Sequence, residues 1–261
     1  MQNNLAVNII VGGLSTLVST RSELANIMVA DCLSARNDRE HTPPKLVFSS
    51  NGQGIALAGK SQEFAKAMDK ADIIHADGMP VVFFSKFTDH PLPERICTTD
   101  FFHDAARAAQ ANSLSFYILG STKSQNDAAV SKIREMYPNV IIAGHRHGYF
   151  SEDEDVAVCE EILATQPDVV WVALGKPRQE LWCVRNRDRL HGIGWLKTCG
   201  GLFSYLTGDA PRAPEWMQKA GLEWLYRTMD DPKRLIWRYL ATNPYALYRL
   251  LRHTGRSKAS R

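Results

Sequence analysis

The feature that most constrains the fold of this chain is a repeated alternation of short apolar runs with longer segments of helical spacing. The runs cover residues 6–11, 45–50, 73–76, 115–120, 140–143, 168–174 and 193–199. Between them, apolar side chains recur at the three- and four-residue spacing of a helix, as in Leu24, Ile27 and Met28. Strands that alternate with helices form a mostly parallel sheet with helices on both faces. The sequence therefore predicts an α/β fold.

One of the apolar runs ends in a carboxylate. Residues 73–76 are followed by Asp77, then by Gly78, which lets the backbone turn, and by Pro80, which suits the first turn of a helix. In an open α/β sheet, ligands bind outside the carboxyl ends of the strands, so Asp77 is a candidate general base. From this stretch alone, a simple cap on a helix that starts near Met79 is the better interpretation.

A short polar loop follows the strand at residues 45–50. It reads Asn51-Gly52-Gln53-Gly54, and its backbone N–H groups are suited to a sugar hydroxyl or a phosphate. No G-K-[ST] follows at the spacing of a Walker loop. An ordinary strand-to-helix turn is an equally good interpretation.

Composition indicates an intracellular globular protein without a metal. Of the 261 residues, 44% are hydrophobic and 23% are charged, and no long uncharged apolar run suggests a transmembrane helix. The first ten residues lack the basic start of a secretory signal, so we expect a cytoplasmic location. The five cysteines form no C-x-x-C pair, and no further ligand accompanies His145 and His147. We therefore expect reduced thiols, no metal site and no cofactor.

The chain changes character at Arg212. From there to the end it has 11 Lys or Arg against 4 Asp or Glu, whereas the preceding part is slightly acidic. Three helices are predicted, over 215–229, 232–241 and 244–253, each with a proline at or beside its start. We divide the chain into an α/β domain at 1–205 and a helical, basic and aromatic appendage at 206–261.

Arginines in this appendage alternate with Trp, Tyr and Leu, which is typical of a helix at a membrane interface. Anionic lipid stabilises each basic residue near its surface by about 1 kcal/mol. For Trp224 and Leu225, packing in a core or dimer is the better interpretation. For residues 245–252 we favour a membrane.

An ordered set of motifs runs from about Leu46 to Leu240. The motifs are Ala76-Asp77-Gly78, Glu94-Arg95 with Asp100, Leu119-Gly120, Gly148-Tyr149-Phe150, Leu174-Gly175-Lys176-Pro177-Arg178-Gln179-Glu180, Gly200-Gly201-Leu202-Phe203, Gly208, Arg212-Ala213-Pro214, Gly221-Leu222-Glu223-Trp224-Leu225-Tyr226-Arg227 and Pro232-Lys233-Arg234-Leu235 ahead of Arg238-Tyr239. This ordered set resembles the WecG/TagA/CpsF family of bacterial glycosyltransferases.

The resemblance implies a Rossmann-like α/β domain and a membrane-contacting appendage that helps complete the active site. It implies transfer of a sugar, with inversion and without an obligatory metal, from a UDP-sugar donor to a polyprenyl-diphosphate-linked sugar acceptor. The enzyme would be peripheral, on an anionic membrane surface at the cytoplasmic face of the bacterial inner membrane. The sequence leaves open whether it forms a homo-oligomer.

The resemblance assigns the role of catalytic base to Asp77. Because no D-x-D motif follows an apolar strand, arginines of the appendage would stabilise the leaving UDP. The candidates for substrate binding are Ser49, Asn51, Arg95, Gln179, Arg212, Arg227, Arg234 and Arg238, with Arg95 on the acceptor diphosphate and Gln179 on sugar hydroxyls or uracil. The chain departs from the family pattern at Ser49-Ser50-Asn51, at Thr98-Thr99-Asp100 and at Ser204, which leaves the sugar open.

Several functions follow from these interpretations. Members of the resembled family with a segment similar to Gly200–Tyr205 belong to exopolysaccharide synthesis, so the resemblance implies UDP-glucose as the donor and exopolysaccharide synthesis as the pathway. The alternative is an N-acetylmannosaminyl or uronic-acid transferase, of teichoic acid or common-antigen type. A non-enzymatic module that binds nucleic acid through its basic end is a further hypothesis, but no nucleic-acid motif is present. A nucleotide-dependent oxidoreductase is disfavoured because no G-x-G-x-x-G follows a strand.

Overall fold

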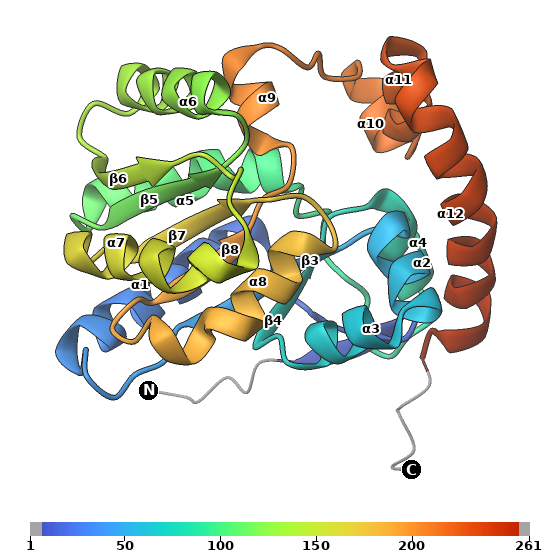
Figure 1. Ribbon diagram of the computed structural model, residues 1–261. Coiled ribbons are helices and arrows are strands. Elements are labelled where there is room, and N and C mark those ends of the chain that lie inside the picture. Colours follow the sequence, from blue (N-terminus) through green and yellow to red (C-terminus); the bar gives the residue numbers. More distant parts are fainter. Residues whose placement is uncertain (1–6, 256–261) are drawn as a thin grey trace.

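A six-stranded sheet forms the centre of the molecule (Figure 1). The computed structural model describes residues 7–255, apart from the side chain of Arg234. The strands are β3 (Lys45–Ser50), β4 (Ile73–Ala76), β5 (Ser115–Gly120), β6 (Ile141–Arg146), β7 (Val169–Ala173) and β8 (Trp195–Thr198), in the order β4-β3-β8-β7-β5-β6. Every neighbouring pair is parallel, which confirms the α/β prediction.

Helices cover both faces of this sheet and enclose two apolar cores. One face carries α1 (Arg21–Asn37), α5 (Thr98–Ala111), α6 (Lys123–Met136) and α9 (Leu202–Thr207); the other carries α2 (Gly52–Lys60), α3 (Gln62–Asp69), α7 (Asp155–Thr165) and α8 (Arg178–Asn186). Short 3-10 turns at Glu152–Glu154 and Arg187–Arg189 precede α7 and follow α8. Val170 of β7 lies in one core and Trp171 in the other, which is why this strand is apolar throughout.

The first predicted strand does not join the sheet. Instead, β1 (Asn8–Val11) pairs with β2 (Leu14–Leu17) as a separate antiparallel hairpin, and Ala6 lies outside the described residues. The linking residues Gly12 and Gly13 have φ angles of 60° and 85°, as a two-residue hairpin turn of type I′ requires. The Gly-Gly pair was the available signal for this turn.

Two helical segments of the chain are divided. The segment between β3 and β4 is split into α2 and α3 at Ser61, whose hydroxyl accepts a hydrogen bond from the Phe64 N–H and so starts a new helix. The helix expected at 215–229 is split into α10 (Glu215–Lys219) and α11 (Glu223–Asp230). Gly221, with a φ of 74°, ends α10 in the left-handed conformation.

Two other predicted helices are joined. A single helix, α12 (Pro232–His253), runs through Pro244, so the prediction of a new start there was wrong. The body supports α12 on both sides of the proline: Lys60 Nζ donates to the Ala241 carbonyl at 2.9 Å, and Tyr245 Oη donates to the Gly59 carbonyl at 3.1 Å. Tertiary contacts thus compensate for the weakened helix.

The helix α12 lies along one side of the molecule, against α2 and near α4 (Met79–Ser85) (Figure 1). Its inner face contributes Leu235, Ala246 and Leu250 to the buried residues. Its outer face exposes Ile236, Trp237, Leu240, Tyr248 and Leu251, and Leu247 is exposed at the edge that lines the cavity described below. The inner face therefore packs on the body, and membrane binding by the outer face stays a prediction.

No helix in residues 7–255 is long and apolar enough to cross a membrane. The predicted domain boundary at 205/206 falls within α9 and stays a prediction.

Candidate active site

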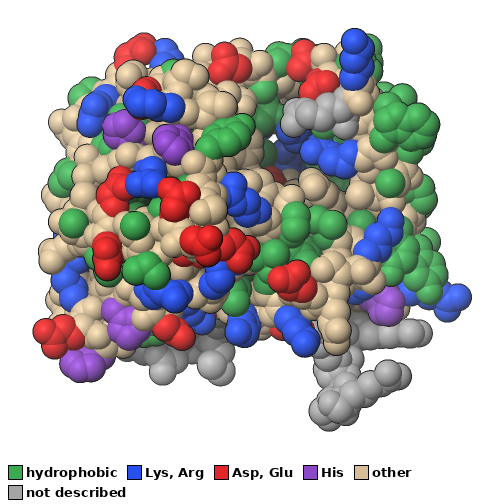
Figure 2. Space-filling view, in the orientation of Figure 1, with side chains coloured by type: hydrophobic (Ala, Val, Ile, Leu, Met, Phe, Trp, Pro, Cys, Tyr) green, Lys and Arg blue, Asp and Glu red, His purple; other side chains and the backbone are tan. Residues whose placement is uncertain are grey.

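A cavity of about 950 Å³ lies at the carboxyl ends of the strands. Each of the six parallel strands delivers a lining residue just past or at its end: Asn51, Asp77, Ser121, Gly148, Leu174 and Gly200. The opposite wall comes from α11 and α12 of the appendage. Figure 2 shows a hollow between the body and this appendage, with basic side chains in it. The location is the one expected for ligands of an open α/β sheet.

Asp77 lines this cavity directly after β4. Its main-chain N–H donates to the Ser50 carbonyl at 2.8 Å, which fixes the backbone between two strands. Its Oδ1 accepts from the Thr98 N–H at 3.2 Å, at the first residue of α5. The N-cap of α4 is Gly78, without a side-chain bond, so the interpretation of Asp77 as the cap of that helix was wrong. Within the described residues, Oδ2 has no hydrogen bond.

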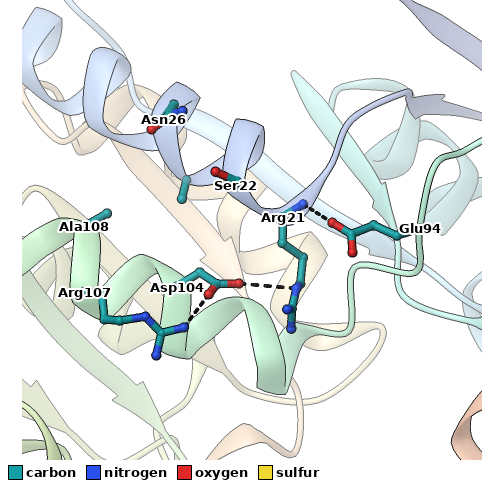
Figure 3. Close-up of a pocket in the computed structure, with 8 residues that line it drawn as sticks. Arg21, Ser22, Asn26, Glu94, Asp104, Arg107 and Ala108 are labelled. Carbon is teal, nitrogen blue, oxygen red and sulfur yellow. Dashed lines mark hydrogen bonds and ion pairs between the residues drawn. The ribbon is translucent and has the colours of Figure 1, made fainter.

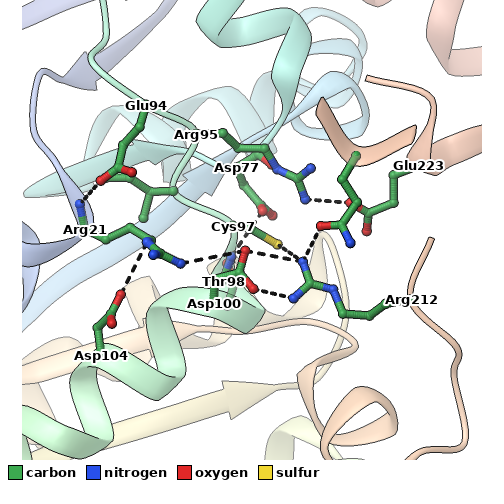
Figure 4. A network of polar contacts seen from close by, with 12 residues as sticks. Arg21, Asp77, Glu94, Arg95, Cys97, Thr98, Asp100, Asp104, Arg212 and Glu223 are labelled. Atoms are coloured by element: carbon green, nitrogen blue, oxygen red, sulfur yellow. Dashed lines mark hydrogen bonds and ion pairs between the residues drawn. The ribbon is translucent and has the colours of Figure 1, made fainter. Parts of the chain in front are cut away.

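Arg95 connects this aspartate to the appendage. Its Nε donates to the Asp77 carbonyl at 2.9 Å, and its Nη2 donates to Glu223 Oε2 of α11 at 2.6 Å (Figure 4). The two side chains are only 13% and 18% exposed. A hydrogen-bonded charge pair with so little solvent is stronger than a surface pair. The ion pair therefore places α11 beside the candidate base.

Arg212 lies near this network but is not among the residues that line the cavity. Its guanidinium binds both carboxylate oxygens of Asp100, and Nη2 donates to Gln218 Oε1 at 2.8 Å (Figure 4). Burial alone would raise the pKa of Asp100, but the hydrogen bonds from Arg212 outweigh it and hold that pKa below its ordinary value. Arg212 thus secures the start of the appendage to α5, and phosphate binding by it stays a prediction.

Arg227 and Arg238 do line the cavity. The Arg227 guanidinium lies over the Tyr205 ring at 5.5 Å from its centroid, and that of Arg238 lies over the Tyr239 ring at 4.8 Å. Neither forms an ion pair with a carboxylate in the described part of the chain, and the buried Nε of Arg238 has no hydrogen-bond partner there. Arg234 lies in the first turn of α12, and its side chain is outside the described structure.

Burial alone would lower the pKa of Arg227, but the neighbouring Tyr205, Tyr239 and Glu223, and to a lesser extent Asp77, raise it. The candidate base and this cation of the appendage line the same cavity.

The other predicted binding residues lie on the body wall. Asn51 Oδ1 accepts from the Gly54 N–H at 3.0 Å, so residues 51–54 form the ordinary start of α2, with Gly52 and Gln53 on the cavity. The buried Ser49 has a carbonyl that accepts from Lys176 Nζ at 3.1 Å.

Gln179 is buried at the same wall. Its Nε2 donates to Glu180 Oε1 at 2.9 Å, and its Oε1 accepts from the Gly200 N–H at 3.1 Å. Both ends of its amide are therefore bonded within the protein.

The sequence profile of the glycosyl transferase WecG/TagA/CpsF family matches residues 18–260. The chain belongs to this glycosyltransferase family.

Three similar proteins are each named N-acetylglucosaminyldiphosphoundecaprenol N-acetyl-beta-D-mannosaminyltransferase. The relative from Bacillus subtilis (strain 168) is 34% identical over 203 residues, which cover 77% of each chain. The relative from Bacillus spizizenii is 31% identical over 75% of this chain and 74% of its own. The relative from Staphylococcus aureus (strain NCTC 8325 / PS 47) is 30% identical over 72% of this chain and 73% of its own.

Sequence reasoning missed two charged groups of this glycosyltransferase. Lys176 lines the cavity, and its Nζ binds the fully buried Glu180 at 2.7 Å; Glu180 Oε2 has no partner within the described residues. Glu223 is the partner of Arg95. Lys176 and Glu223 lie within the family motifs, and this was the only sequence signal that they belong to the site. Their position at the cavity could not be predicted, because it depends on packing between distant segments.

Other features of the described residues lie outside this site. All five cysteines are buried and unbridged, as predicted. No group of three or more His, Cys, Asp and Glu side chains in residues 7–255 is placed to hold a metal, and His145 Nδ1 bonds Asn126 at 2.9 Å. A second cavity of about 320 Å³ lies between α1 and α5 (Figure 3). Asp104 pairs with the side chains of Arg21, at 3.3 Å, and Arg107, and Glu94 Oε1 accepts from the Arg21 main-chain N–H at 2.6 Å.

Proposed function

We propose that this glycosyltransferase moves N-acetylmannosamine, with inversion, from a UDP-linked donor to an N-acetylglucosamine carried on a polyprenyl diphosphate. The observation that carries the proposal is the placement of a carboxylate, Asp77, and two arginines of the appendage, Arg227 and Arg238, on one cavity. A transferase that releases a nucleoside diphosphate needs a base at the attacking hydroxyl and positive charge at the leaving group.

The sugar and the acceptor follow from the relatives. Three proteins that match about three quarters of this chain are named as N-acetylmannosaminyltransferases with a diphosphoundecaprenol-linked acceptor. They favour the N-acetylmannosaminyl alternative over the UDP-glucose donor and exopolysaccharide pathway that the segment at Gly200–Tyr205 suggested. Membership of an enzyme family also disfavours the nucleic-acid-binding module.

Asp77 takes the proton from the acceptor hydroxyl while that oxygen attacks the anomeric carbon of the donor. Its Oδ1 is held by the Thr98 N–H, which leaves Oδ2 to receive the proton. The bond from the anomeric carbon to the UDP oxygen breaks on the opposite side, and its electron pair leaves with UDP. Attack and departure on opposite faces invert the anomeric configuration.

The charge that develops on UDP is stabilised by Arg227 and Arg238, because guanidinium groups form paired hydrogen bonds to phosphate oxygens. Their stacking on Tyr205 and Tyr239 orients them without neutralising them. Arg95 binds the acceptor diphosphate beside Asp77, and the reaction needs no metal ion.

The outer face of α12 would bring the enzyme to the lipid-linked acceptor. Trp237, Leu240 and Leu251 on this face are each at least 60% exposed, and contiguous exposed apolar surface marks a site of interaction. Together with the basic residues of the appendage, this face suits an anionic membrane at its cytoplasmic side.

A donor and acceptor screen tests the proposal. The full chain is given UDP-N-acetylmannosamine, UDP-glucose or UDP-glucuronic acid, each with and without a polyprenyl-diphosphate-linked N-acetylglucosamine in detergent, with EDTA present. We expect acceptor-dependent release of UDP from UDP-N-acetylmannosamine alone. Turnover of UDP-glucose in its place, or a requirement for added Mg²⁺, would contradict the proposal.

A further inference from the structure

The short helix α4 carries an apolar stripe that begins in the cavity. Pro80 lines the cavity, and Phe83 and Phe84 follow it within α4 at spacings of three and four residues, the spacing of side chains on one face of a helix. Phe87 lies two residues beyond the end of α4. The three phenylalanine rings lie 5.6 to 6.2 Å apart and form one cluster. Phe83 is 54% exposed and Phe87 is 69% exposed, although both are large aromatic side chains.

A second apolar stripe leaves the same cavity along α12. Leu247 and Leu250 line the cavity, and the exposed Leu251 follows Leu247 by one helical turn. The helices α4 and α12 are in contact, and beyond the end of α12 a Cβ atom at Gly255 would lie 3.4 Å from the Phe87 carbonyl oxygen. The stripes of α4 and α12 therefore extend from the cavity to neighbouring parts of the surface.

We infer that this α4–α12 surface, formed by Phe83, Phe84, Phe87, Leu247 and Leu251, binds the first isoprene units of the lipid-linked acceptor. The inference rests on the proposed function and goes beyond it by assigning a binding surface to the lipid part of the acceptor.

The occupant follows from the position of α4. Asp77, which receives the proton of the acceptor hydroxyl, stands two residues before the first residue of α4, and Pro80 is the second residue of that helix. A seven-residue helix is about 10 Å long, so the aromatic cluster lies beyond the polar part of the cavity. An acceptor with its sugar at Asp77 and its diphosphate at Arg95 must pass a hydrocarbon chain outward from the cavity. Exposed phenylalanines, which gain most from contact with hydrocarbon, line that exit.

The test compares two acceptors that differ only in the lipid. One has N-acetylglucosamine diphosphate on an undecaprenyl chain, and the other has it on a short butyl group; both are assayed in the same detergent with the full chain. The variant is Phe83→Ser with Phe87→Ser. The control is Ile141→Ser with Val156→Ser, because Ile141 and Val156 are similarly exposed on the body but far from the cavity lining.

We expect KM for the undecaprenyl acceptor to rise about tenfold in the Phe83/Phe87 variant, since two aromatic contacts with the chain are lost. KM for the butyl acceptor and kcat for both acceptors should match those of the wild type and of the control. An equal change with both acceptors would show a structural role and would overturn the inference.

Vesicle flotation separates this surface from a general membrane contact. With vesicles containing anionic lipid and no acceptor, we expect the Phe83/Phe87 variant to bind as the wild type does. Loss of vesicle binding with an unchanged KM in detergent would also overturn the inference. Failure of the proposed function is distinguishable, because the wild type itself would then turn over neither acceptor.

Discussion

The two walls of the cavity are built in different ways. On the body wall, the polar groups at the ends of β3 and β7 are bonded to the protein itself: Asn51 caps α2, Gln179 bridges Glu180 and Gly200, and Lys176 is paired with Glu180. On the appendage wall, Arg227 and Arg238 lie over tyrosine rings and have no carboxylate partner within the described residues. None of the side chains of α11 is fully buried.

The two walls therefore contribute different groups to the site. The sheet and its helices fix the candidate base and the polar groups around it through hydrogen bonds within the body. The appendage contributes two arginines that have no carboxylate partner within the described residues, and it is seated on the body through contacts such as Glu223 on Arg95 and Tyr245 on Gly59. We therefore expect substitutions on the two walls to have different effects on activity.

The largest effect is expected on the body wall, from Asp77→Asn. The amide oxygen still accepts the hydrogen bond from the Thr98 N–H, so the fold should be retained, but the general base is lost. We expect kcat to fall by about 10²- to 10⁴-fold with little change in KM, measured as acceptor-dependent release of UDP. Asp188→Asn, at an exposed position, is the matched control. An Asp77→Asn enzyme with wild-type turnover would remove Asp77 from the mechanism.

On the appendage wall, Arg227→Gln and Arg238→Gln should each lower kcat by about 10- to 100-fold, because charge-assisted hydrogen bonds to the leaving diphosphate are lost. Inhibition by UDP should weaken in parallel, measured as a rise in its inhibition constant. Lys219→Gln, an exposed cation of α10, should change neither quantity. If UDP inhibits both arginine variants as it inhibits the wild type, the appendage does not bind the leaving group.

The contact between α12 and α2 can be disturbed by a substitution that changes no residue lining the cavity. A Cβ atom at Gly59 of α2 would lie 2.6 Å from the Tyr245 ring and 2.5 Å from the Arg249 guanidinium. Gly59→Leu should therefore push α12 away and lower turnover about tenfold through misplacement of Arg238. Ala111→Leu, at an exposed helix position, is the control. Full turnover in Gly59→Leu would show that the cations act without this contact.

The smallest effect on activity, but a clear one on stability, is expected beneath the body wall at Lys197. Burial on β8 lowers the pKa of this lysine to about 8, and its Nζ donates to the Thr198 carbonyl at 2.6 Å. An unfolded lysine has a pKa of about 10.4, so between about pH 8 and pH 10 the unfolded state binds more protons and stability rises with pH. Below pH 8 the folded protein carries the buried charge.

Lys197→Met removes this charge. Thermal unfolding should show a gain of about 3 kcal/mol at pH 7 that shrinks toward pH 10, whereas Lys66→Met, at an exposed position, should show no such dependence. A gain that is equal at both pH values would mean that the buried amine is not what limits stability.

Much of the body could be predicted because its strands are buried on both faces. Such strands read as continuous apolar runs, and their carboxyl ends meet at one edge of the sheet, so the pattern made Asp77 a candidate for this edge. The stretch alone favoured a helix cap, and only the family resemblance assigned Asp77 the role of base. The hairpin β1–β2 could not be placed in this way, since periodicity does not tell which strand an apolar run pairs with.

The appendage was predictable only in composition. Its basic and aromatic character follows directly from its residues. Pro244 was predicted to start a helix, but whether a proline interrupts a helix depends on the residues that pack against it, which the sequence does not show. The partners of its arginines were equally hidden: Arg212 meets Asp100 across more than a hundred residues, whereas Arg227 and Arg238 remain on the cavity.

The sequence by itself determined the α/β class, the family and the candidate base, because these depend on local spacing and on ordered motifs. The tertiary structure alone decided which cations face the base, which face of α12 is left exposed, and that the aromatic stripe of α4 leads out of the cavity. Those properties depend on contacts between segments distant in the chain, and no local pattern of residues specifies such contacts.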